Sequence, residues 1–371
     1  MRLAFIDLGD LDYTAHTPLL QPLGGTESAL CYLCAELAQM GHTITVLNRT
    51  SAPGEYDGVS YVHRDTPGAL SRANDHDAAI VIGVADGLAL RAAGVRVPLI
   101  FWTGHLAGVD RVQALARPEE LAVWTAFVFV SDWQRERFVQ RFGIDPAMTT
   151  VLRNAIAPAF AAQPVRPAWF ETGAEPTLVY TSTPFRGLVV LLHAFESIRS
   201  AVRAARLRIY SGMATYQSAQ DATFAKIYAR AREIAGADYV GPVAQPALAE
   251  EISTAAALAY PSIYPETSCI AAMEAMSAGA AVLTTRLGAL PETVGEFGTF
   301  VDPGNDAREL VARYADSVVA TLRTMESDPK SAAQRRAAQI RHVREHCVWP
   351  VRAREWTQWL AQVARGGPDR A

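Results

Sequence analysis

Two acidic residues, Glu266 and Glu274, stand in a stretch of sequence that is otherwise small and apolar. A helix is predicted over 268–278, and the amides at its start attract a phosphate because they have no partner within the helix. These amides belong to Thr267, Ser268, Cys269 and Ile270. A carboxylate buried at position 274 needs hydrogen-bond donors, which the hydroxyl groups of a bound sugar or ribose would supply. The spacing is equally compatible with a helix-capping Glu266 and a surface Glu274.

A single arginine provides the matching positive charge. Arg186, followed by Gly187, opens a helix that comes after a strand predicted over 177–181. A guanidinium at a helix N-terminus above a sheet suits a diphosphate, although a solvated arginine is the simpler alternative. Any cation used in chemistry here is expected to be an arginine, because Lys226 and Lys330 are the only lysines.

Two features of the first half could also contact a ligand. Gly24 and Gly25 precede a helix predicted over 26–40 and would let a ligand approach the backbone closely, unless they form a plain turn. His105 follows a strand predicted over 99–102, at the carboxyl edge of a sheet. A histidine there either hydrogen-bonds a substrate or serves the structure alone.

No metal site is predicted from the sequence. Asp10 and Asp12 have no other potential ligands nearby and are interpreted as polar loop residues. Cys31 and Cys34 form a C-x-x-C pattern inside a predicted helix, where small residues on a buried face are the simplest interpretation.

Composition sets the class of protein. The 371 residues are 50% hydrophobic and 19% charged, which predicts two domains with sizeable cores rather than disorder. The formal net charge of −4 argues against a dedicated nucleic-acid binder. The sequence shows neither a membrane-spanning run nor a secretory signal, and its four cysteines do not make a disulfide framework. We therefore expect a cytoplasmic protein.

Strands and helices alternate along the chain and must position these residues. Strands are predicted over 3–7, 43–47, 79–82, 99–102 and 127–130, and then over 177–181, 207–210, 239–240, 258–261, 281–284 and 299–301. Continuous apolar strands separated by helices indicate parallel sheets that are covered on both faces. The proline-rich stretch 154–176 is predicted to link two domains. The predicted fold class is α/β, with two Rossmann-like doubly wound parallel-sheet domains facing across a ligand-binding cleft.

These features resemble family 4 of the retaining nucleotide-sugar glycosyltransferases, which have the GT-B fold. The Glu-x7-Glu spacing of Glu266 and Glu274, followed by Ala-Met-Ser-Ala-Gly, carries the resemblance. Supporting matches are found in segments 24–27, 41–46, 130–133, 151–156, 186–188 and 291–292. The matches extend from residue 1 to about 303, which is nearly the whole chain.

The resemblance implies an acceptor-binding domain over 1–157 and a nucleotide-sugar-binding domain over 158–345. It also implies that a terminal helix over 346–371 crosses back to the first domain. The family needs no metal and no cofactor, and its donor is a nucleoside-diphosphate sugar, here UDP or GDP linked.

The resemblance also implies roles for individual residues. Glu266 would hold hydroxyl groups of the donor sugar and Glu274 those of the ribose. The amides from Thr267 to Ile270 would hold the diphosphate, with Arg186 neutralising the leaving group. In the first domain, His105 matches the family's histidine near the reacting sugar, and Gly25 would let that domain reach the phosphates.

The sequence departs from the family at the phosphate site. The family typically has an arginine five residues before the position of Arg186, and this chain has Thr181 there. Ser182 and Thr183 offer hydroxyl groups but no charge, and Ala289 replaces a second family glycine. One guanidinium and a helix terminus must therefore stabilise the departing diphosphate.

We therefore expect a metal-independent, retaining glycosyltransferase of hexosyltransferase type. It would move a sugar from its nucleotide carrier to a glycan, lipid-linked or small-molecule acceptor. A lipid-linked acceptor would bring a cytoplasmic protein to the inner face of the membrane as a peripheral contact. Two alternatives remain: a nucleotide-sugar epimerase with the same architecture, and a non-catalytic GT-B protein that binds carbohydrate or a partner. Thr181 is the main support for the last.

Overall fold

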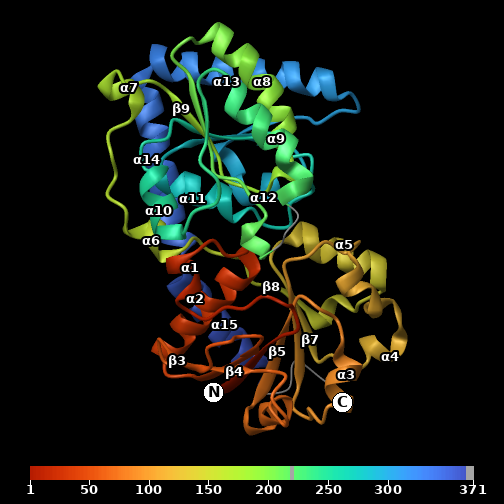
Figure 1. Cartoon of the computed structure of the whole chain (residues 1–371). Helices are drawn as coiled ribbons and strands as arrows, with labels where there is room; N and C mark the ends of the chain where they lie inside the picture. Colours follow the sequence, from red (N-terminus) through yellow and green to blue (C-terminus); the bar gives the residue numbers. More distant parts are fainter. Residues whose placement is uncertain (218–220, 365–371) are drawn as a thin grey trace. The chain divides into compact units, whose positions relative to one another are not determined.

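The computed structural model describes residues 1–217 and 221–364, which form two compact units. The first unit contains Met1–Pro18, Gly24–Ala155 and the chain from Trp349 onward, and the second contains Leu19–Leu23 and Ile156–Val348. Each unit is built on its own sheet, with helices on both sides of it (Figure 1). The prediction of two successive parallel-sheet α/β halves is confirmed.

The first unit has an eight-stranded sheet in the order β3-β4-β2-β1-β5-β6-β7-β8. Its strands are β1 (Arg2–Asp7), β2 (Thr43–Asn48), β3 (Gly54–Tyr56), β4 (Val59–His63), β5 (Ala78–Ile82), β6 (Leu99–Thr103), β7 (Ala126–Phe129) and β8 (Thr149–Val151). The strands pair in parallel except for β3, which is antiparallel to β4. The central strands are mostly apolar because helices cover both faces of a parallel sheet.

Helices α2 and α15 lie on one side of this sheet, and α3, α4 and α5 lie on the other (Figure 1). Their bounds are α2 (Gly25–Gln39), α3 (Gly87–Ala92), α4 (Pro118–Leu121), α5 (Asp132–Phe142) and α15 (Trp349–Ala364). The short turns in this part of the chain are α1 (Thr17–Leu20), η1 (Leu70–Asp75), η2 (Asp110–Ala116) and η3 (Pro146–Met148). The last helix therefore belongs to the first unit, where it packs on α2.

The second unit has a six-stranded parallel sheet in the order β11-β10-β9-β12-β13-β14. Its strands are β9 (Thr177–Tyr180), β10 (Arg206–Ile209), β11 (Ala237–Tyr239), β12 (Ala257–Tyr260), β13 (Ala281–Thr285) and β14 (Gly298–Val301). Its helices are α6 (Pro158–Ala162), α7 (Trp169–Thr172), α8 (Leu188–Ala201), α9 (Asp221–Glu233), α10 (Gln245–Glu251), α11 (Ile270–Ala278), α12 (Leu290–Val294), α13 (Ala307–Ser327) and α14 (Pro329–His346), with turns η4 (Pro184–Arg186), η5 (Ala214–Tyr216) and η6 (Gly295–Phe297). Helix α8 packs on α13, and α11 packs on α14.

Several elements differ from the sequence prediction. The edge strands β3 and β8 and the penultimate strand β4 were not predicted, because they are short and carry no continuous apolar run. Helix α11 begins at Ile270, two residues later than predicted. The proline-rich stretch contains the boundary between the two units, at Ala155 and Ile156, and beyond it the chain forms α6 and α7, which bury Phe160 and Trp169 within the second unit.

Among the described residues, none of the helices combines the length and the apolar character needed to cross a bilayer.

Candidate functional site

The strand order reverses once in each sheet, between β1 and β5 in the first unit and between β9 and β12 in the second. Ligands of doubly wound sheets bind beyond the carboxyl ends of the strands at such a reversal. Arg186 follows β9 and Glu266 follows β12, so both residues lie at the reversal of the second sheet.

Two side chains hold the carboxylate of Glu266, which is only 3% exposed. The Nη1 atom of Arg186 donates to both carboxylate oxygens, at 2.6 Å to Oε1 and 2.8 Å to Oε2. The hydroxyl group of Tyr260, the last residue of β12, donates to Oε1. Side chains thus compensate the charge of this buried carboxylate, and the carboxylate does not act as the N-cap of α11. Tyr260 was missed by the sequence analysis, because a partner six residues away in a loop follows no periodic pattern.

The backbone of Glu266 is held by the loop that follows β13. The amide of Ala289 donates to the carbonyl of Glu266 at 2.7 Å, and Gly288 forms an isolated bridge with Glu266. Gly288 has a φ of +63°, and a Cβ atom there would come within 2.4 Å of the Glu266 carbonyl oxygen. The close approach needs the glycine at 288, whereas Ala289 has an ordinary φ of −87°, so the departure from the family at 289 leaves this contact intact.

Arg186 is packed among aromatic rings. Its guanidinium carbon lies 4.8 Å from the ring centroid of Tyr264 and 5.6 Å from that of Phe185. Burial alone would lower the pKa of Arg186, but Glu266 together with Tyr260 and Tyr216 outweighs burial and holds that pKa well above its usual range. Its buried Nε atom has no hydrogen-bond partner among the described residues. The following Gly187, at φ +123°, leaves no room for a side chain, since a Cβ atom would lie 2.2 Å from the carbonyl oxygen of Pro261.

Glu274 is buried inside the second unit, not at its surface. It is 6% exposed, and its Oε1 atom has no hydrogen-bond partner within the part of the chain that the structure describes. Burial raises the pKa of Glu274 to about 8, although a hydrogen bond from the backbone of Ala157 acts in the opposite direction. An unpaired buried carboxylate oxygen is costly and is the kind of group that a ligand hydroxyl satisfies.

The start of α11 provides amides and no competing cap. Cys269 occupies the N-cap position and its side chain makes no capping bond. Thr267 and Cys269 are buried, whereas Ser268 and Ile270 are half-buried. Because the N-cap residue makes no capping bond with its side chain, the helix start has the capacity to bind an anion through backbone amides.

Hydroxyl groups gather after β9 and β10. Thr181 and Ser182 are half-buried, and the Ser182 Oγ atom lies 3.4 Å from the hydroxyl oxygen of Tyr260. Among the described residues, the buried hydroxyls of Thr183 and Ser211 have no hydrogen-bond partner. Ser211 lies two residues beyond β10 and could have been singled out by the rule that identified His105, which lies two residues beyond β6.

The first unit carries the remaining predicted residues. Gly24 is the N-cap of α2 and Gly25 its first residue, so the pair begins a helix rather than forming a plain turn. His105 lies two residues beyond β6, and its amide donates to the Thr103 hydroxyl at 3.0 Å. Its ring lies against Gly83, where a Cβ atom would come within 3.1 Å of the imidazole Nε2.

Two carboxylates at the same edge were not predicted. Asp7 ends β1 and is 5% exposed, and its carboxylate accepts bonds from the Gly9 amide and the Tyr13 hydroxyl, both at 2.7 Å. Burial, reinforced by the neighbouring Asp7, raises the pKa of Glu27 on α2 to about 7. Acidic groups therefore lie near the strand reversal of the first sheet.

The other polar candidates have structural surroundings. Asp10 pairs with Arg49 at 2.9 Å, and Cys31 and Cys34 are buried on α2. Across residues 1–217 and 221–364, no group of three or more His, Cys, Asp or Glu side chains is placed to hold a metal ion.

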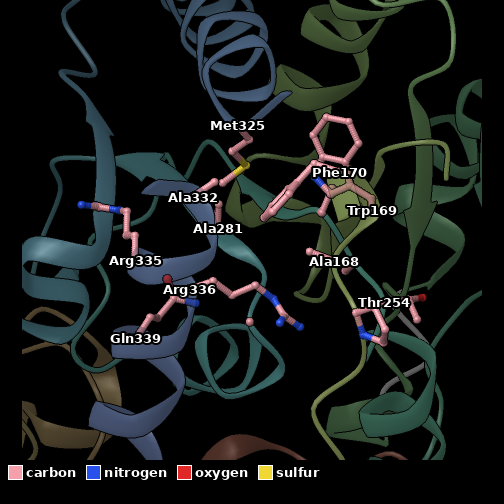
Figure 2. A pocket seen from close by; sticks show the side chains of 14 residues that line it. Ala168, Trp169, Phe170, Thr254, Ala281, Met325, Ala332, Arg335, Arg336 and Gln339 are labelled. Carbon is pink, nitrogen blue, oxygen red and sulfur yellow. The ribbon is translucent and has the colours of Figure 1, made fainter. Parts of the chain in front are cut away.

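A small cavity of about 30 Å³ in the second unit is not part of this site (Figure 2). It is lined by Trp169 and Phe170 on one side and by Arg335, Arg336 and Gln339 on the other. It includes Ala281, the first residue of β13, and thus lies at the amino end of the strands. A space of this size holds a water molecule or two, whereas ligand pockets measure about 300–1,000 Å³.

Comparison with known proteins finds a family match within the second unit. Residues 175–318 match the family model described as "Glycosyl transferases group 1". A search of the curated proteins gave no match.

Solved structures match over almost the whole chain. Sucrose-phosphate synthase from Thermosynechococcus elongatus superposes with a TM-score of 0.72 and 18% identity, covering 99% of this chain and 100% of that chain. A glycosyltransferase from Rickettsia africae gives a TM-score of 0.70 and 13% identity, with 99% of each chain covered. HepE from Anabaena, solved in complex with UDP and glucose, superposes with a TM-score of 0.67 and 14% identity, covering 98% of this chain and 100% of that chain.

These similarities agree with the resemblance seen in the sequence. At such identities the structural matches establish the fold, and the family match covers most of the second unit. The chain has the GT-B fold, and its residues 175–318 are similar to the glycosyl transferases group 1.

Proposed function

We propose that the protein is a retaining, metal-independent glycosyltransferase that moves a sugar from a nucleoside-diphosphate sugar to a hydroxyl group of an acceptor. The observation that carries the proposal is the hydrogen-bonded group formed by half-buried Arg186 with buried Glu266 and Tyr260 at the strand reversal of the second sheet. The unpaired oxygen of buried Glu274 supports it, because nucleotide ribose offers the hydroxyl donors that this oxygen lacks.

The proposed donor site distributes roles over the second unit. Glu266 binds hydroxyl groups of the donor sugar, and Glu274 binds the ribose. The amides from Thr267 to Ile270 and the guanidinium of Arg186 hold the diphosphate, with hydroxyls of Thr181 and Ser182 as further ligands. A UDP or GDP sugar is the donor, a choice supported by the UDP complex of HepE.

Catalysis in this proposal is mainly electrostatic. The acceptor oxygen bonds to the anomeric carbon on the face from which the diphosphate leaves, and the bond between that carbon and the diphosphate oxygen breaks. The leaving oxygen takes the acceptor proton, so no side-chain base is needed. Arg186 and the helix start stabilise the charge that develops on the diphosphate, which is the largest contribution expected of such a site.

The acceptor is proposed to bind to the first domain, over 1–157, while the second domain, over 158–345, binds the donor. His105, Asp7 and Glu27 lie at the edge of the first sheet where acceptor hydroxyl groups would bind. Gly24 and Gly25 would let this domain approach the phosphates. A glycan or lipid-linked acceptor is proposed for a cytoplasmic enzyme, and the lipid-linked form would place it at the inner face of the membrane.

The first experiment is a thermal-shift panel of nucleoside diphosphates, followed by transfer assays with the corresponding nucleotide sugars. The preferred nucleotide should raise the melting temperature, because a ligand that binds only the folded state stabilises it by RT ln(1 + [L]/Kd). Transfer should fall by on the order of 10²-fold or more in Arg186→Ala and Glu266→Ala. Unchanged kcat/KM in both variants would remove these residues from the mechanism.

One observation favours a second candidate, a GT-B protein that binds without turnover. Thr181 supplies no charge, and the single arginine of the site is already paired with Glu266. This candidate predicts nucleotide-sugar or carbohydrate binding in calorimetry with no loss of donor in the presence of acceptors. NMR of the nucleotide sugar without acceptor provides the test for an epimerase, which would convert the donor alone.

A further inference from the structure

Gln134 on α5 uses its whole side chain to join two strand ends in the first unit. It is fully buried, at 0% exposure. Its Oε1 atom accepts from the amide of Val130 at 2.8 Å, just beyond β7. Its Nε2 atom donates to two carbonyl oxygens beyond β6, at 3.0 Å to Thr103 and 2.7 Å to His105. The side chain amide is therefore satisfied on both its donor and acceptor sides.

The segment that Gln134 holds is the one that sets the position of His105. The amide of His105 is fixed by the Thr103 hydroxyl, and its carbonyl is fixed by Gln134. The imidazole lies so close to Gly83 that a Cβ atom there would be 3.1 Å from Nε2. A Cβ atom on Gly104 would in turn meet the Thr26 hydroxyl at 3.3 Å. With both neighbours this close, a shift of the backbone must move the ring.

Gln134 is itself held in place. It lies in the first turn of α5, whose N-cap Ser131 accepts from the Gln134 amide at 3.0 Å. The helix and its cap thus fix Gln134 in place. If the hydrogen bonds from Gln134 to Thr103 and His105 were lost, the loop after β6 is the part that would move. A buried carbonyl that loses its donor is costly, so the loop would rearrange toward other partners.

We propose that Gln134 is a positioning residue that fixes His105 at the carboxyl edge of the first sheet. The proposal rests on the role given to His105 in the proposed function. Displacing a substrate-contacting group by about 1 Å can cost on the order of 10²-fold in rate. Gln134 touches neither donor nor acceptor in this proposal and acts through the His105 loop alone.

The experiment compares Gln134→Met with Gln113→Met, a matched control. Gln113 also donates from Nε2 to two loop carbonyls, at 2.9 Å to Ala107 and 2.8 Å to Val109. In Gln134→Met, kcat should fall by about 10- to 100-fold with the donor KM within about twofold. Gln113→Met should keep kcat within about twofold, because the backbone of His105 retains both of its bonds.

A spectroscopic readout separates this proposal from the proposed function. Imidazole NMR signals of ¹⁵N-histidine-labelled protein, with His105 assigned by comparison with His105→Asn, should move in Gln134→Met and stay in Gln113→Met. This readout needs no activity, so it still decides the positioning role if the wild type transfers no sugar. The proposal is overturned if Gln134→Met folds and shows neither a shift of the His105 signals nor a change in kcat. If the His105 signals move but kcat is unchanged, the link between this position and catalysis is overturned.

Gln134→Glu keeps the test usable if the methionine variant does not fold. Glutamate retains an acceptor for the Val130 amide but loses both donors. A protonated carboxyl regains one donor, so kcat relative to wild type should recover as the pH falls. If the ratio of the variant's kcat to the wild-type kcat does not depend on pH, and the variant has an unchanged melting temperature, the hydrogen-bond mechanism is contradicted.

Discussion

At the scale of the residue, Glu266 and a bound diphosphate would compete for one guanidinium. Arg186 donates to both oxygens of Glu266, and the position that could supply a second cation is Thr181. Glu266→Gln removes the negative charge and should raise the affinity for a nucleoside diphosphate by about tenfold, or ~1.4 kcal/mol. Sugar transfer should fall in the same variant. Isothermal calorimetry measures the affinity.

Tyr260→Phe is the control for this prediction. It removes the other partner of Glu266 while leaving the ion pair with Arg186, so diphosphate affinity should stay within about twofold of wild type. A drop in diphosphate affinity in Glu266→Gln would show that the carboxylate does not compete for Arg186.

Glu274 should make stability depend on pH. Its folded pKa of about 8 lies above the usual 4.5, so between these values the folded state holds a proton that the unfolded state releases. Stability is therefore greatest at the acid end of this window, falls as pH rises through it, and levels off above pH 8. Glu274→Gln should flatten the slope in urea unfolding between pH 5 and 8, whereas exposed Glu326→Gln should keep it. A wild type that is equally stable at pH 5 and pH 8 would refute the raised pKa of the buried Glu274 carboxylate.

At the scale of the element, the loop between β13 and α12 should be intolerant of a side chain at one position. Gly288→Ala forces a Cβ atom toward the Glu266 carbonyl oxygen, 2.4 Å away, in a backbone with φ of +63°. Gly143→Ala is the control, because Gly143 has a similar φ of +67° and nothing within 4 Å. The control should lose about 1 kcal/mol of unfolding free energy and Gly288→Ala clearly more, together with activity. Equal losses of unfolding free energy in the two variants would mean that the loop moves to accommodate the added Cβ atom.

The elements also show what the sequence could predict. The buried strands β1 and β5 could be predicted because a continuous apolar run indicates a strand that is covered on both faces. Helix α2 could be predicted from its apolar residues and from the glycine at which it stops. The buried state of Glu274 could be inferred from its apolar surroundings. The pairing of Arg186 with Glu266 could not, since these residues are 80 positions apart and meet only because β9 and β12 are neighbours. Gln134 was missed for the same reason, as its partners lie on two loops.

At the scale of the whole molecule, the last helix should stabilise the first unit selectively. Trp356 is 1% exposed, and its ring centroid lies 5.2 Å from that of Trp102 on β6. Trp356→Ala should destabilise by about 3–5 kcal/mol, as large cavities in cores do. Hydrogen exchange should show the loss of protection in β1, β5 and β6 and not in β9 to β14. Leu20→Ala, at a side chain that is 79% exposed, is the control, and a loss spread evenly over both units would contradict the prediction.

The assignment of α15 to the first unit has a consequence for biosynthesis. Nascent chains usually fold from the N-terminal domain onward as they leave the ribosome. Here the second unit has all of its segments once Val348 has been translated, while the first still lacks its final helix. The second unit is thus the earlier one to have all of its segments, although most of it is synthesised later, and the first unit must wait for α15 to be translated before Trp102 is covered.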